Sequence, residues 1–180
     1  PEPMNNCFFN IKRDESVPLR IIHIGGYDER KGLEDFLKSI NIIISKYPEL
    51  GIDIVGTGCK KREIFLKNLS ENLGIIKNIK WHGFLSSYEI SLLHKNAALY
   101  VITSQNENSP NTLAEALCAG TPCVAYDVGG IASMFENNKS GFLVPKGNID
   151  ILAKKMMLLI NNPELRKTFS TESIKITKDN

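Results

Sequence analysis

Short apolar runs alternate along the chain with segments in which apolar residues recur at helical spacing. Runs long enough for one buried strand each occupy residues 21–24, 52–55, 79–81, 97–102, 122–126 and 141–144. Between the first two runs, Leu33, Phe36, Leu37 and Ile40 follow the period of an amphipathic helix. Similar patterns predict further helices over 64–73 and 86–94, from 110 onward, over 148–160, and from 163 onward.

This alternation determines the expected fold class. Strands separated by helices pair in parallel through right-handed crossovers. The sequence therefore predicts an α/β fold, a doubly wound, Rossmann-like parallel sheet of about six strands. Ligands of such sheets bind beyond the carboxyl ends of the strands, and the glycine turns and polar loops after residues 24, 83, 102 and 126 all fall on that edge.

Length and composition indicate an ordinary globular domain. The 180 residues suffice for one domain, expected over 20–177, whereas residues 1–19 carry three prolines and mixed charge and are expected to form an interdomain linker. A net charge of +2 without an arginine-rich tract argues against a nucleic-acid partner. The four cysteines form no C-x-x-C pair, and no signal-peptide or membrane-span pattern occurs, so we expect reduced cysteines and a cytoplasmic location.

The segment 107–130 carries the strongest candidate chemistry. Glu107 and Glu115 bracket the start of a predicted helix, for which Ser109 is a preferred N-cap and Pro110 a suitable first residue. The backbone N–H groups of residues 111–113 then lack intrahelical acceptors at the positive end of the helix dipole, which makes them a site for anions such as phosphate. The order carboxylate, amides, carboxylate matches the order hexose, diphosphate, ribose in a sugar nucleotide.

Glu115 is expected to need a partner. Its neighbours Leu113, Ala114, Ala116 and Leu117 indicate a helix that is buried on most sides, where an unpaired carboxylate is unfavourable. Two ribose hydroxyls would each donate a charge-assisted hydrogen bond worth about 1.5–3 kcal/mol. We therefore interpret Glu115 as a ligand contact rather than as an exposed surface residue.

These residues resemble a known signature. Glu107, Glu115, the Gly120-Thr121-Pro122 turn and the Gly129-Gly130 turn follow the order of the donor-binding motif of retaining glycosyltransferases with the GT-B fold, family 4 (group 1). Further landmarks follow the same order, namely Gly25 to Gly32, Gly56-Thr57-Gly58, Trp81-His82-Gly83-Phe84 and Gly141-Phe142-Leu143-Val144. The resemblance therefore spans about residues 20 to 165. The chain is thus similar to the C-terminal, donor-binding domain of such an enzyme.

The resemblance implies a hexosyltransferase. It implies transfer of a hexosyl unit from a UDP-, GDP- or ADP-sugar to a hydroxyl acceptor with retained configuration, without a metal or another cofactor. The segment Asn-Ser-Pro-Asn-Thr at residues 108–112, between the two glutamates, resembles that of a branch of the family associated with bacterial surface-polysaccharide synthesis. An N-terminal acceptor domain of the same protein is the implied partner, and any peripheral membrane association would run through that domain. The fragment alone is expected to be inactive.

The same resemblance assigns roles to residues. Glu107 would orient the transferred sugar and Lys31 would bind the diphosphate, and these are the candidate catalytic residues. The family carries an Arg where this chain has Gly26, so Arg30 is either the substitute cation or a solvated helix residue. Phe84 is either a platform for the base or part of the core. The candidate binding set is Gly26, Arg30, Lys31, Phe84, Leu85, Asn108, Ser109, Asn111, Thr112, Leu113 and Glu115.

Two other functions remain open at this stage. A nucleotide-sugar epimerase has domains of the same fold, and a noncatalytic nucleotide-binding module would need the same phosphate site. A P-loop is excluded because no Gly-x-x-x-x-Gly-Lys-Ser/Thr occurs. A dinucleotide fingerprint is also absent, since Gly56-Thr57-Gly58 lacks its third glycine.

Overall fold

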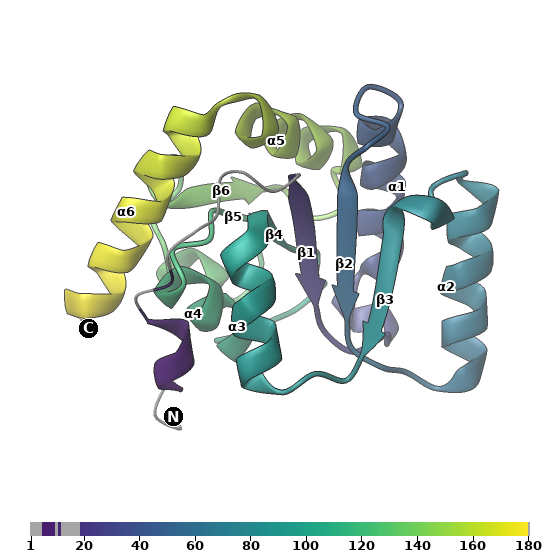
Figure 1. Ribbon diagram of the computed structural model, residues 1–180, viewed down its shortest axis with the longest axis horizontal. Coiled ribbons are helices and arrows are strands. Elements are labelled where there is room, and N and C mark those ends of the chain that lie inside the picture. The colour runs from purple at the N-terminus through teal and green to yellow at the C-terminus, as the bar shows by residue number, and fades with distance from the viewer. Residues whose placement is uncertain (1–4, 10, 12–18, 180) are drawn as a thin grey trace.

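The computed structural model describes residues 5–9, 11 and 19–179. Its centre is one six-stranded parallel sheet in the order β3-β2-β1-β4-β5-β6 (Figure 1). The strands are β1 (Arg20–Ile24), β2 (Gly51–Val55), β3 (Ile79–Gly83), β4 (Ala97–Ile102), β5 (Cys123–Tyr126) and β6 (Gly141–Val144). The predicted doubly wound α/β sheet is confirmed.

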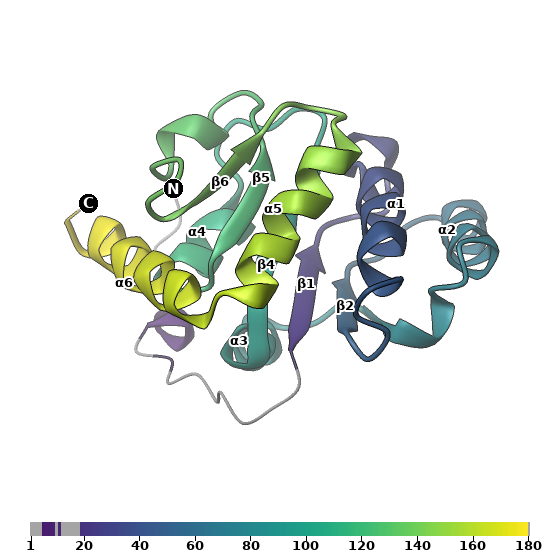
Figure 2. The same ribbon diagram turned by 90° about the horizontal axis from the view of Figure 1, so that it is seen from above.

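Helices cover both faces of the sheet, as the two views show (Figures 1 and 2). One face carries α1 (Leu33–Ile44), α2 (Lys60–Asn72) and α5 (Ile149–Asn161), and the other carries α3 (Ser87–Asn96) and α4 (Asn111–Cys118). The last helix, α6 (Pro163–Asp179), contacts α4 and α5. Short 3-10 turns complete the described elements: η1 (Asn6–Phe8), η2 (Glu29–Lys31), η3 (Ile76–Asn78) and η4 (Ile131–Ser133).

The strands divide the core into two layers because their side chains alternate between faces. Leu99 and Val101 of β4 belong to the larger layer, which α1 and α5 cover with residues such as Phe36 and Met156. Tyr100 and Ile102, which alternate with them along β4, belong to the second layer, against Leu113 of α4. Every residue of β4 is buried, as expected for a central parallel strand.

The predicted helix 64–73 differs from the observed one in its buried face. Helix α2 begins earlier, at Lys60, and buries Leu66 and Ser70. Ile64 and Phe65 are about half exposed, and the Phe65 ring lies under the Arg62 guanidinium at 5.1 Å. Because α2 covers the edge of the sheet near β3, a narrower apolar stripe is enough to hold it.

The predicted linker, residues 1–19, lies mostly outside the described residues. Its described turn η1 buries Phe8 completely, and the Phe8 ring meets that of His94 edge-on at 6.1 Å. Residues 6–8 therefore contact the domain through α3 and α4.

The strand order places a topological switch point between β1 and β4. Successive crossovers run outward in opposite directions from this pair, so the loops that follow β1 and β4 face each other at the carboxyl edge. Both loops carry residues of the candidate set, which makes this edge the expected position of a ligand.

Candidate functional site

The loops after β1 and β4 are joined by direct backbone contacts. The N–H of Gln105 donates to the carbonyl of Arg30 at 2.7 Å, and the Thr103 hydroxyl donates to the carbonyl of Lys31 at 3.1 Å. Gly32 has a φ of 63° and lies so close that a Cβ would stand 2.0 Å from the Thr103 carbonyl oxygen. This close approach requires glycine, and it places Lys31 opposite the loop of Glu107.

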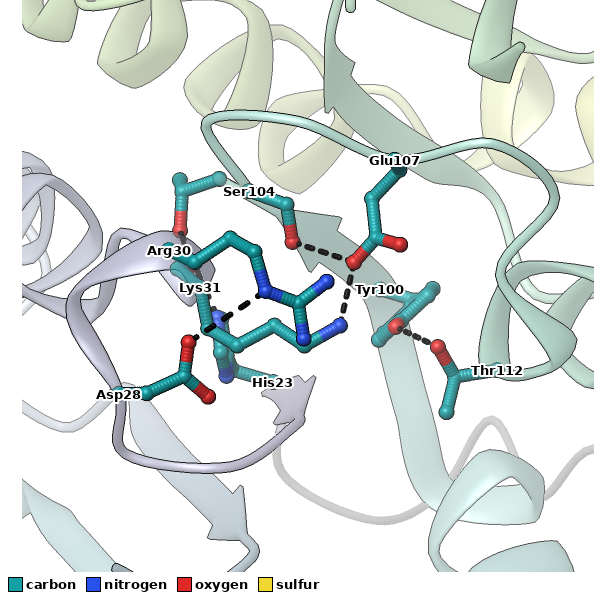
Figure 3. A network of polar contacts seen from close by, with 9 residues as sticks. His23, Asp28, Arg30, Lys31, Tyr100, Ser104, Glu107 and Thr112 are labelled. Atoms are coloured by element: carbon teal, nitrogen blue, oxygen red, sulfur yellow. Dashed lines mark hydrogen bonds and ion pairs between the residues drawn. The ribbon is translucent and has the colours of Figure 1, made fainter. Parts of the chain in front are cut away.

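Lys31 and Glu107 form an ion pair in the structure (Figure 3). The Lys31 ammonium contacts Oε1 of Glu107, and the Ser104 hydroxyl donates to the same oxygen at 2.9 Å. The Glu107 side chain is 10% exposed and that of Lys31 21% exposed. The two candidate catalytic residues are therefore brought together, in contact with each other rather than at separate points of the rim.

A glycine pair holds the Glu107 loop from the other side. The N–H of Gly130 donates to the Glu107 carbonyl at 3.0 Å. A Cβ on Gly129 would lie 1.8 Å from that carbonyl oxygen, and one on Gly130 would lie 1.9 Å from the Asn108 carbonyl oxygen. The Gly129-Gly130 turn after β5 thus acts as a close-fitting support for the backbone that carries Glu107.

Helix α4 begins one residue later than the sequence predicts. Pro110 is the N-cap, with extended backbone (ψ 121°), and its carbonyl accepts from Leu113 and Ala114. Ser109 does not cap the helix, and its hydroxyl points to the Met134 sulfur at 3.8 Å. Because Glu107 and Asn108 are held against the glycine turn, the chain enters the helix through Pro110.

The tip of α4 offers two amides rather than three. The Leu113 N–H already donates to Pro110 at 3.0 Å, and the Leu113 side chain is buried in the core. For the N–H groups of Asn111 and Thr112 the described part of the chain supplies no acceptor. Two unpaired donors at a helix N-terminus are suited to an anion.

Beneath this tip lies Tyr100 of β4, which is completely buried. Its hydroxyl donates to the Thr112 Oγ1 at 2.8 Å, which leaves the Thr112 hydroxyl hydrogen for an outside acceptor. Burial raises the pKa of Tyr100, and the charges of Glu115 and Glu107 act in the same direction. Both carboxylates therefore lie within electrostatic range of this phenol.

Glu115 occupies the next turn of α4 and is half-buried. Burial raises the pKa of its carboxyl group. Within the described residues its carboxylate has no hydrogen-bond or ion-pair partner. Glu115 is therefore a partly desolvated acceptor to which no described residue donates, and its assignment as a ligand contact stays a prediction.

Arg30 and Gly26 lie on the β1 loop. The Arg30 side chain is 57% exposed, and its Nε lies 3.6 Å from Asp28 Oδ1 (Figure 3). Gly26 has no unusual φ, and a Cβ there would meet only the Asp28 carboxylate at 3.1 Å and a backbone oxygen at 3.7 Å. Two cations therefore lie in this loop, although neither occupies the position of Gly26.

Phe84 is an exposed aromatic ring at the same edge. It follows β3 directly and is 85% exposed, while Leu85 is half-buried. The next residue, Ser86, caps α3: its hydroxyl accepts from the Glu89 N–H at 3.3 Å, and Glu89 accepts in return from the Ser86 N–H at 2.8 Å. This capping box fixes the start of α3 and with it the position of Phe84, which is not part of the core.

Three residues of the site floor lie outside the predicted set. Ser104 and Thr103 hold Glu107 and the Lys31 backbone, respectively, and only their position after the β4 strand could have indicated them. His23 lies buried beneath Lys31, where burial, followed by the charge of Lys31, lowers its pKa to about 3. His23 is therefore neutral at pH 7 and adds no positive charge to the site.

The described residues bear on a possible metal site and on a possible membrane span. No three His, Cys, Asp or Glu side chains of that part converge as a metal-ligand set. None of its helices has the length and apolar character needed to cross a bilayer. The absence of a metal from the reaction stays a prediction.

The sequence matches a family profile described as glycosyl transferases group 1 over residues 8–176. An uncharacterized glycosyltransferase of Haemophilus influenzae is 32% identical over 169 residues, which are 93% of this chain and 46% of the relative. A poly(ribitol-phosphate) alpha-N-acetylglucosaminyltransferase of Staphylococcus aureus is 26% identical over 84% of this chain and 30% of its own length. The chain thus spans less than half the length of these relatives.

Solved structures show the same fold. The C-terminal domain of the group 1 glycosyl transferase LpcC from Francisella tularensis superposes with a TM-score of 0.81 at 21% identity, covering 94% of both chains. Anabaena Alr3699/HepE in complex with UDP-glucose superposes with a TM-score of 0.83 at 22% identity over 91% of this chain and 45% of that one. Because the profile matches nearly the whole length of this chain, the chain belongs to the glycosyl transferases group 1, and it has the fold of a GT-B C-terminal domain.

Proposed function

We propose that this chain is the donor-binding domain of a retaining glycosyltransferase, which transfers a hexosyl unit from a nucleoside-diphosphate sugar to a hydroxyl acceptor. The observation that carries the proposal is the tip of α4. Among the described residues, two backbone amides without an acceptor stand there between a largely buried Glu107 with its lysine and a half-buried Glu115 without a partner. This combination suits a ligand that has a dianionic centre and hydroxyl groups on both sides.

The diphosphate would lie at the α4 tip. The N–H groups of Asn111 and Thr112 and the Thr112 hydroxyl are its proposed donors, with Lys31 and Arg30 as counter-charges from the β1 loop. Preorganised donors of this kind stabilise the leaving diphosphate as its charge develops. No metal is needed in this proposal, because the helix end and the two cations supply the positive charge.

The rest of the donor would extend to either side. Glu115 would accept from the ribose hydroxyls, while Phe84, with Leu85 beside it, would provide an apolar surface for the base. Glu107 would orient the hexose. Gly26, Asn108 and Ser109 would border the site with backbone and small polar groups, since Asn108 and Ser109 are both exposed.

The relatives' names support the substrate class and the setting. One is a poly(ribitol-phosphate) alpha-N-acetylglucosaminyltransferase, and another is the amylovoran biosynthesis glycosyltransferase AmsK of Erwinia amylovora. The Anabaena protein with the same fold is described in complex with UDP-glucose. We therefore propose a role in bacterial surface-polysaccharide synthesis, with a cytoplasmic location and an N-terminal acceptor domain as the partner.

A titration series tests this function. The chain is screened by thermal shift with UDP, GDP, ADP and the corresponding glucose derivatives, and each binder is titrated calorimetrically. Selective binding of one base, strongly weakened but still measurable in the variant Lys31→Met, is the expected result. Equal or absent binding of all three bases would contradict the proposal and favour a noncatalytic module. In the intact protein, release of free nucleoside diphosphate separates transfer from epimerisation.

A further inference from the structure

The ion pair between Lys31 and Glu107 poses a question about the proposed function. Each residue is assigned to a different part of the donor, Lys31 to the diphosphate and Glu107 to the hexose. In the structure the two side chains instead neutralise each other as an ion pair. A diphosphate that recruits Lys31 must therefore break this pair and leave a largely buried carboxylate without its cation.

One partner of the pair is fixed and the other is free to move. Glu107 is held by the Ser104 hydroxyl at 2.9 Å and by the Gly130 N–H on its carbonyl at 3.0 Å. Apart from its ion pair with Glu107, the polar contacts of Lys31 within the described residues are backbone ones, to the Asp28 carbonyl and the Thr103 hydroxyl at 3.1 Å each. The flexible lysine stem can thus swing its ammonium away while the carboxylate stays in place.

Bare diphosphate and complete donor differ in what they offer to Glu107. A hexose supplies hydroxyl donors that replace the lysine as hydrogen-bond partners of the carboxylate. A nucleoside diphosphate places no hexose hydroxyl there, so Glu107 would keep the Ser104 hydrogen bond but lose its cation, and would repel the adjacent phosphate. A buried carboxylate without a partner is costly.

Building on the proposed function, we propose that Lys31 and Glu107 form an exchange pair that discriminates the sugar-bearing donor from the nucleoside-diphosphate product. The two side chains pair with each other when no donor is bound. The donor opens the pair by giving the diphosphate to Lys31 and hexose hydroxyls to Glu107. Once the hexose has left, Glu107 competes with the diphosphate for Lys31 and promotes release of the product.

The proposal predicts an unusual sign for one substitution. Glu107→Gln keeps the shape and the Ser104 contact but frees Lys31, so it should bind the preferred one of UDP, GDP and ADP about tenfold more tightly than the parent. The preference for the matching glucose derivative over the diphosphate should fall by at least the same factor. Both are measured by calorimetric titration at one fixed ionic strength, because surface electrostatics depend on salt.

Two controls make the test specific. Asp127→Asn removes an exposed carboxylate from the same edge without touching Lys31, and a change in affinity of less than about twofold is expected. In a Lys31→Met background, Glu107→Gln should give no gain, since the residue that it releases is missing. This cycle isolates the coupling between the two side chains.

The outcomes separate the two proposals. If the parent binds none of the three nucleoside diphosphates, the proposed function itself fails and the exchange fails with it. If the parent binds one and folded Glu107→Gln binds it no more tightly, or gains equally in the Lys31→Met background, the exchange pair is wrong while the donor site stands.

Discussion

Replacing Glu115 should affect the stability of the domain and its nucleotide binding in opposite directions. The half-buried carboxylate of Glu115 has no protein partner among the described residues, and burial raises its pKa. Replacing it by glutamine removes the charge and keeps the shape. Glu115→Gln should therefore raise the free energy of unfolding of the domain measured without nucleotide, while it weakens nucleotide binding.

The magnitudes follow from the environment of the side chain. Relief of an unfavourable functional charge typically stabilises a protein by about 0.5–2 kcal/mol, and the partial exposure of Glu115 favours the lower end, about 0.5–1 kcal/mol at pH 7. For binding, two charge-assisted bonds of about 1.5–3 kcal/mol each become neutral bonds of about 0.5–1.5 kcal/mol to the amide oxygen, a loss of about 1 kcal/mol per bond. A loss of about 2 kcal/mol, roughly 30-fold in Kd, is expected.

The pH dependence supplies a further check. Because the folded-state pKa of Glu115 is raised, the penalty exists where the group is ionised in both states and disappears below the unfolded value of 4.5. The stability advantage of Glu115→Gln should thus be present at pH 7 and vanish near pH 4.

Urea unfolding of both proteins at the two pH values measures the free energies of unfolding, and calorimetry measures Kd. A variant that is destabilised at pH 7 would show that Glu115 has a protein partner. A variant that is stabilised but binds UDP, GDP or ADP as the parent does would refute the ribose assignment.

Three further substitutions test other parts of the site. Phe84→Ala should change the free energy of unfolding by less than about 0.5 kcal/mol, because the ring is 85% exposed, yet weaken nucleotide binding severalfold. Phe65→Ala is the matched control, and equal binding by both variants would contradict the role of Phe84 as a platform for the base. Gly130→Ala should lower the free energy of unfolding by about 1–3 kcal/mol and abolish measurable binding, because its Cβ would meet the Asn108 carbonyl oxygen at 1.9 Å. A melting temperature and Kd like those of the parent would show that the glycine turn does not position Glu107. The position of Gly26 can accept a side chain, because only the flexible Asp28 carboxylate would crowd it. Gly26→Arg should therefore tighten diphosphate binding severalfold through its charge while the uncharged Gly26→Met does not, and identical affinities for the two variants would contradict the charge argument.

The fold was predictable because its signals are local. The β4 run Ala97–Ile102 is apolar throughout and has helical patterns on either side, and the structure places it at the centre of the parallel sheet. Short helical stretches such as 64–73 were less well predicted. There the period does not reveal how much of each face the rest of the fold will cover, and Phe65 remains half exposed.

The site was predictable only where local rules act. The N-terminus of α4 follows from its residues to within one position, but the shift from Ser109 to Pro110 depends on the contact between Glu107 and Gly130, which lie far apart in sequence. The pairing of Lys31 with Glu107 depends equally on the topology, since β1 and β4 become neighbours only in the folded sheet.

The most direct test follows the backbone amides of the α4 tip. In a ¹⁵N-labelled sample of this chain titrated with UDP, GDP or ADP, the N–H resonances of Asn111 and Thr112 should show the largest shifts, with that of Leu113 much less affected. Shifts confined to other surfaces, such as the apolar pocket of about 350 Å³ beside Leu19 and Tyr47, would contradict the binding of diphosphate at this helix end.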